Sequence, residues 1–289
     1  MTKLKITIKK LVLLVFVISI FGNASVSNAQ DKNEVLLVSD VKWTPLNPAR
    51  GKLGPQAGNL WGDRTGVGPS GFLVKFVDGF SSPPHIHNIM YRGVVISGLV
   101  HNDDPSANKA WMSSGSYWTQ AAGEIHITAA KGSQNIAYIE IEQSPYLVLP
   151  TSKAFDEGDK SVNIEASNIV WLDATNTQWI KQAENTSSKS AAKIAFLWGE
   201  PQGKELNGTF VKLPAGSSGK ILVDQPIMRG VLIQGKVNHG IEAKGDQNTL
   251  MPGSYFSSQG KSIHYLAVDE SEGCIIYLRS KGSYELVMD

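Results

Sequence analysis

The strongest constraint on the fold of this chain is that its sequence repeats at a constant distance. The matched segments keep their order, and each second copy lies 137 or 138 residues after the first. They are LWGDRTGVGPSGFLVKFVDGFSS (60–82) with LWGEPQGKELNGTFVKLPAGSSG (197–219), RGVVISG (92–98) with RGVLIQG (229–235), and GSYWTQAAGEIH (115–126) with GSYFSSQGKSIH (253–264). Ordered matches of this kind are typical of a tandem duplication. The sequence therefore predicts two similar domains, which we expect at 36–150 and 160–289.

Short segments rich in β-branched and aromatic residues dominate the first copy. Three of them, at 72–77, 93–100 and 137–141, are bounded by Gly, Pro, Asn or Asp, as strands usually are. Many closely spaced short strands with glycine-rich turns favour an all-β barrel or sandwich over a parallel βαβ fold.

The first 29 residues have the pattern of a cleavable secretory signal. A lysine-rich start precedes an apolar run at 11–21 that is too short to span a bilayer, and small residues follow at 27–29. An uncleaved anchor helix is the alternative. We expect a secreted or periplasmic protein that begins at Gln30 and has no stable membrane insertion after cleavage.

Charge and cysteine content narrow the classes of partner. Loss of the four lysines of the signal lowers the formal net charge from +1 to −3, and no cluster of Lys or Arg remains. The basic footprint of a nucleic-acid-binding protein is therefore missing from the sequence. Cys274 is the single cysteine, so the chain has no internal disulfide, and we expect this thiol to be buried as a small apolar group.

The histidines indicate a metal site in the first domain. His85 and His87 stand two residues apart, so on a strand they point to the same side. His126 lies in a second strand-like segment, GEIHI. Three neutral imidazoles with an open fourth position are typical of a catalytic rather than a sealed structural metal site.

These residues fall into two patterns that resemble the motifs of the cupin superfamily. Gly79, five residues, His85-x-His87, three residues, Tyr91, six residues and Gly98 resemble the first motif, with tyrosine where the family has glutamate. The run from Gly115 to His126 resembles the second motif, with alanine where the family has proline. With the duplication, the chain resembles a bicupin of an uncharacterised cupin-like family, over nearly all of residues 36–289. The resemblance implies two tandem antiparallel β-barrels of jelly-roll type and the metal ligands His85, His87 and His126.

Two further residues are candidates for the catalytic chemistry. Tyr91 occupies the position of the family's fourth ligand, but a phenol is a weak ligand at its ordinary pKa. We expect it to donate a hydrogen bond to bound water or substrate. Glu124 has the same strand parity as His126, and it could serve as ligand, as a partner of a ligand or as a base. A solvent-exposed glutamate beside a turn is the alternative.

The second domain lacks a comparable set of ligands. The positions equivalent to the first-motif residues hold Leu222, Asp224 and Met228, and only His264 is retained. One histidine cannot hold a divalent ion, so we expect the second domain to serve packing, dimerisation or pocket shaping. His101, which precedes an acidic turn, is expected at the surface.

The function that follows is an exported bicupin with one divalent metal ion, acting as a metal-dependent enzyme on a small molecule. The three-histidine set is compatible with a dioxygenase, isomerase or hydrolase, by resemblance alone. A non-catalytic protein that binds or senses a small ligand through its metal is the alternative. The sequence does not distinguish among zinc, iron, nickel, copper and manganese as the bound ion. It is also compatible with a homodimer.

Overall fold

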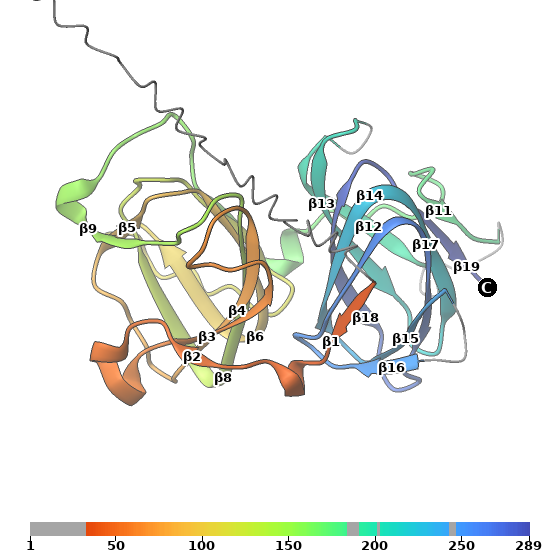
Figure 1. Ribbon diagram of the computed structural model, residues 1–289, viewed down its shortest axis with the longest axis horizontal. Helices are drawn as coiled ribbons and strands as arrows, with labels where there is room; N and C mark the ends of the chain where they lie inside the picture. Colours follow the sequence, from red (N-terminus) through yellow and green to blue (C-terminus); the bar gives the residue numbers. More distant parts are fainter. Residues whose placement is uncertain (1–32, 184–190, 201–202, 243–246) are drawn as a thin grey trace, which may run out of the picture. The chain divides into compact units, whose positions relative to one another are not determined.

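The computed structural model describes residues 33–183, 191–200, 203–242 and 247–289. The predicted signal segment at 1–29 lies outside the described residues. In the described part, the helices are four short 3-10 turns: η1 (Val38–Asp40), η2 (Pro48–Leu53), η3 (Thr151–Lys153) and η4 (Ala166–Asn168). None of them is long or apolar enough to cross a membrane. The rest is strand and loop, so the prediction of an all-β fold is confirmed (Figure 1).

The first barrel is built on an antiparallel sheet of order β10-β7-β6-β8-β4-β3-β2. Its strands are β2 (Thr44–Pro45), β3 (Gln56–Trp61), β4 (Ser70–Phe76), β6 (Tyr91–Asp103), β7 (Tyr117–Gln120), β8 (Ile127–Ile141) and β10 (Val162–Ile164). A separate antiparallel pair, β5 (His85–His87) with β9 (Val148–Pro150), completes the barrel.

The second barrel is built on a sheet of order β12-β13-β18-β14-β17-β15-β16. Its strands are β12 (Lys193–Gly199), β13 (Leu206–Leu213), β14 (Ser218–Gln234), β15 (Val237–Ile241), β16 (Gln247–Leu250), β17 (Tyr255–Val268), β18 (Cys274–Lys281) and β19 (Glu285–Met288), with β1 (Glu34–Leu36) and β11 (Ile180–Lys181) at its margins. The two-residue pairing of β11 with β19 is parallel. The two barrels are of the predicted jelly-roll type.

At both ends of the first predicted domain, a strand pairs with a different barrel from the one that its sequence position predicts. β1 pairs with β17 of the second barrel, and β10 pairs with β7 of the first. The second barrel therefore includes β1, which ends where the region assigned to the first domain begins. The first barrel includes β10, from the start of the region assigned to the second domain.

The repeated residues make the same contacts in both barrels. Trp61 donates its indole N–H to the hydroxyl of Tyr138 at 3.0 Å, and Trp198 donates to Tyr277 at 2.9 Å. Gly71 lies under the first indole, where a Cβ would stand 2.1 Å from Nε1 of Trp61. Gly208 is placed in the same way under Trp198. These glycines recur because only a residue without a side chain lets the indole lie on the strand.

Apolar side chains that alternate along the strands form a separate core inside each barrel. Phe72, Val95 and Ala137 are fully buried in the first, and Ile221, Leu232 and Ile276 in the second. Cys274 belongs to the second core, and burial raises the pKa of its thiol to about 12. The thiol therefore stays protonated at neutral pH, as expected for a packing residue.

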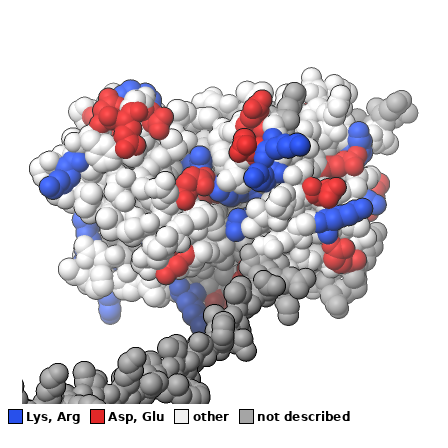
Figure 2. Space-filling model, turned by 45° about the horizontal axis from the view of Figure 1, so that its top comes forward, with Lys and Arg blue, Asp and Glu red and all other residues white. Residues whose placement is uncertain are grey.

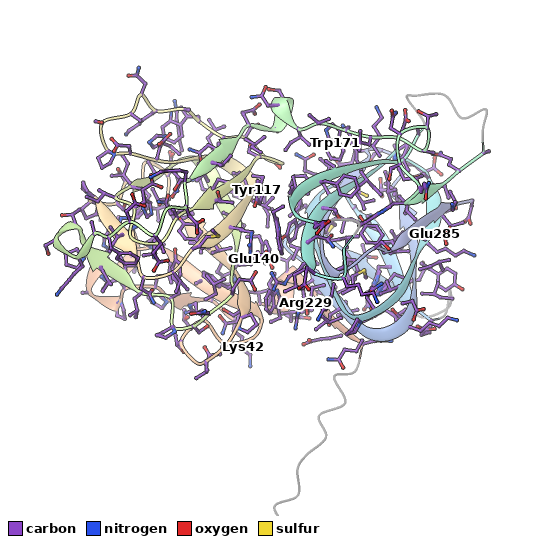
Figure 3. All side chains as sticks on the ribbon, turned by 90° about the horizontal axis from the view of Figure 1, so that it is seen from above. Lys42, Tyr117, Glu140, Trp171, Arg229 and Glu285 are labelled. Atoms are coloured by element: carbon purple, nitrogen blue, oxygen red, sulfur yellow. The ribbon has the colours of Figure 1, made fainter. Side chains whose placement is uncertain are left out.

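A buried ionic cluster joins the two barrels around Glu140 (Figure 3). Its carboxylate accepts hydrogen bonds from Tyr138 at 3.1 Å and, across the interface, from Tyr277 at 2.8 Å. Arg279 lies 3.3 Å away and also binds Glu142 at 2.7 and 2.8 Å. Glu140 pairs with Gly71 in its sheet as Arg279 pairs with Gly208, so equivalent positions of the two copies carry opposite charges and meet.

Cation–π contacts flank this cluster with the same approximate two-fold relation. The guanidinium of Arg92 in the first barrel lies 3.7 Å from the ring centre of Trp198 in the second. That of Arg229 in the second barrel lies 4.2 Å from the ring centre of Trp61 in the first. Contacts of this kind are stronger when the cation is desolvated, so these pairs reinforce the interface on both sides of Glu140.

Replacing Glu140 by alanine should destabilise the protein, because it leaves Arg279 buried with less compensating charge. Removal of one partner of a buried ion pair costs about 3–5 kcal/mol. The measurement is guanidinium-induced unfolding of the purified protein. The control is Asp156→Ala, which breaks an exposed pair with Lys160 and should cost about 0–1 kcal/mol. Equal losses for the two variants would contradict a structural role for the buried cluster.

Candidate metal centre

The three predicted histidines meet at one end of the first barrel. His85 and His87 are the two ends of β5, and they point the same way because they are two residues apart on a strand. His126 stands just before β8 and exchanges two backbone hydrogen bonds with His85, each of 3.0 Å. Strand pairing thus brings together side chains that lie about forty residues apart in the sequence.

The geometry would allow the three imidazoles to hold one metal ion. One ligand nitrogen from each imidazole lies within 4.8 Å of those of the other two. The ring centres of His85 and His126 are 4.4 Å apart, and those of His85 and His87 are 5.0 Å apart. All three side chains are buried. Among the described residues, the convergent group of possible metal ligands consists of these three histidines.

Backbone carbonyls fix the orientation of each imidazole. The Nδ1 atom of His85 lies 2.9 Å from the carbonyl oxygen of Pro83. That of His87 lies 3.0 Å from Leu147 O, and that of His126 lies 3.1 Å from the carbonyl of Glu124. A carbonyl can only accept, so each Nδ1 carries the proton and each Nε2 keeps its lone pair for a metal ion.

Burial keeps these imidazoles neutral. It is the main cause that lowers the pKa of His126 to about 3, with the charge of His85 adding to the effect. Burial likewise lowers the pKa of His87 well below its ordinary value. Neutral imidazole is the form that binds metal, so the site needs no large proton release at neutral pH.

Two tyrosines lie against the histidine cluster, and only one of them was singled out in the sequence. Tyr91 donates its hydroxyl proton to Asn102 at 2.9 Å, and its oxygen stands 3.5 Å from His126 Nε2. The expectation that it donates to water or substrate is untested and stays a prediction. In the structure its proton is directed to Asn102 instead. Tyr146 stacks on His87 with ring centres 4.2 Å apart. Its hydroxyl lies 3.1 Å from His87 Nε2.

Glu124 is held away from the histidine nitrogens. Its carboxylate accepts hydrogen bonds from the backbone and hydroxyl of Ser161, while its carbonyl is the group that faces His126. Its suggested roles as ligand or base stay untested. In this structure the Glu124 side chain links the turn before His126 to Ser161, in the segment after β9.

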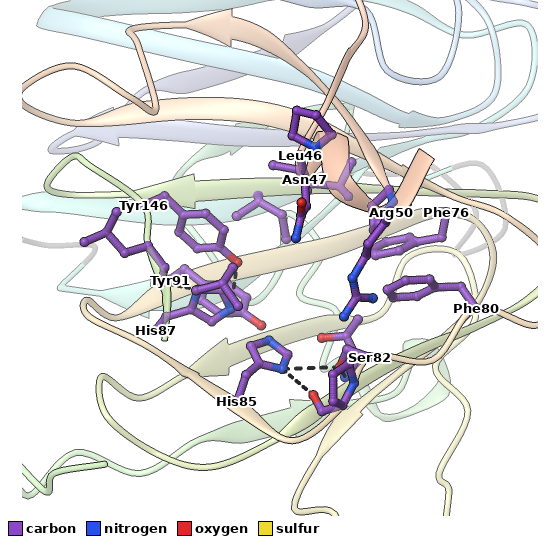
Figure 4. Close-up of a pocket in the computed structure, with 18 of the residues that line it drawn as sticks. Leu46, Asn47, Arg50, Phe76, Phe80, Ser82, His85, His87, Tyr91 and Tyr146 are labelled. Carbon is purple, nitrogen blue, oxygen red and sulfur yellow. Dashed lines mark hydrogen bonds between the residues drawn. The ribbon is translucent and has the colours of Figure 1, made fainter. Parts of the chain in front are cut away.

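A pocket of about 400 Å³ opens beside the histidines (Figure 4). Its wall is mainly apolar and aromatic, and includes Val74, Phe76, Phe80, Trp118, Ile139 and Tyr146. The polar residues that line it are Asn47, Arg50, Ser82, His85, His87, Tyr91 and Thr128. A small organic molecule could therefore reach the metal ligands from this side.

The remaining histidines are buried and serve the packing of the barrels. In the second barrel, both ring nitrogens of His264 are hydrogen-bonded, one to His239 at 2.9 Å and the other to Ser258 at 2.8 Å. This is typical of a buried histidine with a structural role. The expectation that His101 is exposed is wrong. Its ring is 1% exposed and its Nδ1 lies 3.2 Å from Ala110 O, because the chain folds back over the end of β6.

The charged side chains of the surface form no single patch on the face shown in Figure 2. Acidic and basic groups are interspersed there. A stripe of one sign, of the kind that binds a polyanion, is not seen on that face.

Comparison with known proteins gives a match that spans almost the whole described chain. The model of a family described as a domain of unknown function, DUF4437, matches residues 34–287. The curated proteins contain no match to the sequence.

Solved structures of the same fold come from proteins of different kinds. A candidate dioxygenase from Nostoc punctiforme has a TM-score of 0.63 at 14% identity, over 87% of this chain and 83% of that one. Oxalate decarboxylase from Bacillus subtilis, studied for its Mn(II) centres, has a TM-score of 0.51 at 13% identity, over 87% and 78%. Procruciferin, an 11S globulin from Brassica napus, has a TM-score of 0.54 at 10% identity, over 89% and 86%. At these identities the likeness shows the bicupin fold alone.

Elemental analysis should find about one divalent metal ion per chain in the purified protein. The double variant His85→Ala, His87→Ala should hold none, because two of three ligands are lost. His264→Ala is the matched control, since it removes a buried histidine of the second barrel and should leave the metal content unchanged. Loss of metal from the control, or its retention in the double variant, would place the site elsewhere.

Proposed function

The chain belongs to the DUF4437 family, and we propose that its first barrel is a metal-dependent enzyme site acting on a small molecule. The observation that carries the proposal is the set of three imidazoles whose Nδ1 atoms are held by backbone carbonyls, so that each Nε2 keeps a lone pair for a metal ion. His85 and His87 line the pocket beside them. A site of this kind offers three ligands and leaves further positions open for substrate or water.

The donor set fits a divalent transition-metal ion. Neutral imidazole suits zinc, copper, iron and nickel, and manganese joins the candidates because the oxalate decarboxylase of the same fold has Mn(II) centres. Once bound through His85, His87 and His126, such an ion would supply Lewis-acid chemistry, polarising a substrate oxygen or a water.

Tyr146 is the residue best placed to supply a proton. Because Nδ1 of His87 donates to Leu147, its Nε2 must accept the hydroxyl proton of Tyr146. With the Nε2 lone pair engaged by a bound metal ion, the Tyr146 O–H would be available to donate to a substrate oxygen in the pocket. Burial raises the pKa of Tyr146 well above its ordinary value, which favours a proton donor over a base.

Tyr91 has a different part in the same site. Asn102 accepts its proton and also accepts one from Thr128. This leaves the Tyr91 oxygen with its lone pairs toward the histidines, and we expect it to orient a water or substrate donor.

Export is part of the proposal and depends on the sequence of residues 1–29. We expect signal cleavage before Gln30 and a secreted or periplasmic mature protein. N-terminal sequencing of the protein recovered from an exporting host tests this, and an intact Met1 terminus on the exported protein would contradict cleavage.

The catalytic role can be tested with the metal-loaded protein in an oxygen-uptake and hydrolysis screen of small molecules. Tyr146→Phe should keep its metal and lower turnover of any substrate found by about 10²-fold or more, as expected for loss of a general acid. Tyr91→Phe serves as the comparison, because it should also keep the metal while altering substrate binding or turnover.

Two results would count against this assignment. Release of metal by either phenylalanine variant would show that the phenol is a ligand. A loaded wild-type protein that binds small ligands and turns over none of them would favour a non-catalytic binding protein instead.

A further inference from the structure

Arg50 brings a positive charge to the same pocket from outside the barrel. It belongs to η2, between β2 and β3, and lines the pocket with Phe80 and His85. Figure 4 shows its guanidinium directed into the pocket, between the ring of Phe80 and the imidazole of His85. The guanidinium carbon lies 5.9 Å from the Phe80 ring centre. Its charge is also one of the causes that lower the pKa of His85, after burial.

This cation has no anionic partner among the described residues. Its position contrasts with Arg92 and Arg279, which bind Glu142 at 2.6 and 2.7 Å. The residues that line the pocket include neither aspartate nor glutamate. Arg50 is exposed, so water can solvate its guanidinium when no ligand is bound. With a divalent ion on the histidines, the charges facing the pocket would all be positive, which favours an anionic ligand over a neutral or cationic one.

The rest of the wall limits what kind of anion fits. Val74, Phe76 and Ile139 present carbon surface, and a pocket of about 400 Å³ has room for a ring or a branched chain. A two-carbon diacid would leave this surface without contact. The lining therefore favours an anion that carries an apolar body.

We propose that the substrate is a small organic acid with an aromatic or branched apolar body, whose carboxylate is bound by Arg50. This inference rests on the proposed function and names the substrate class of the same site. The planar guanidinium can bind a carboxylate through two parallel hydrogen bonds. The apolar body would then lie against Phe76, Phe80 and Ile139, with the remaining end of the molecule near the histidines.

The proposal can be tested by calorimetric binding of phenylacetate and of its uncharged isostere phenylacetamide. Both are measured on the metal-loaded and the metal-free protein. We expect wild type to prefer the acid by about tenfold or more, the size of one charged hydrogen-bonded pair. Arg50→Gln should abolish the preference, and Arg50→Lys should restore part of it. Lys52→Gln, which removes the same charge from η2 at a residue that does not line the pocket, should leave it intact.

The results separate this inference from the proposed metal enzyme. An Arg50-dependent preference in the metal-free protein supports the carboxylate site even if no metal or turnover is found. A preference that depends on metal and survives in Arg50→Gln would overturn the role of Arg50, since the carboxylate would then bind the ion. Failure of wild type to bind either probe, or equal binding of acid and amide, would overturn the substrate class.

Discussion

The joint between the two barrels depends on one buried carboxylate. Glu140 is 1% exposed, and a charge at such a position is tolerated only when partners replace its water. Those partners are Tyr277 and Arg279 of the second barrel, together with Tyr138 of its own. Because Glu140 and Arg279 occupy equivalent positions, two identical copies would set like charges against each other here. Because this pair has opposite charges, the first copy packs more favourably on the second copy than on another molecule identical to itself.

The candidate metal centre depends on the backbone as much as on the side chains. Each imidazole takes its orientation from a carbonyl, and Leu147, which orients His87, lies directly before β9. The pairing of β9 with β5 places both Leu147 and Tyr146 beside the histidines. The same short sheet thus fixes a ligand and positions the proposed acid. Arg50 lies on the opposite side of the pocket, on η2. The carboxylate of a bound acid would therefore contact η2, and its other end would contact the segment around β5 and β9.

The sequence predicted those features that rest on short-range geometry. The repeat aligned Trp61 with Trp198, which the structure shows in equivalent contacts, and strand parity placed His85 and His87 on one side. Pairing between distant segments that match no motif was out of reach. Tyr146 follows a loop and carries no motif, and nothing in its neighbours indicates that β9 returns to β5. Glu124 has the right parity, but its side chain turns to Ser161 because it stands in a turn before the strand begins.

The pairing of β1 with β17 bears on the order in which the chain can fold. The contact from Val38 to Ser254 that closes this region joins residues 216 positions apart. The first described strand can therefore find its place only after most of the polypeptide is available, and contacts of such sequence separation form slowly. For a chain that emerges from its amino end, the leading segment waits unpaired while the first barrel forms. A tag or fusion at that end would remain next to an unpaired strand until synthesis is nearly complete, and unpaired strands are prone to aggregate.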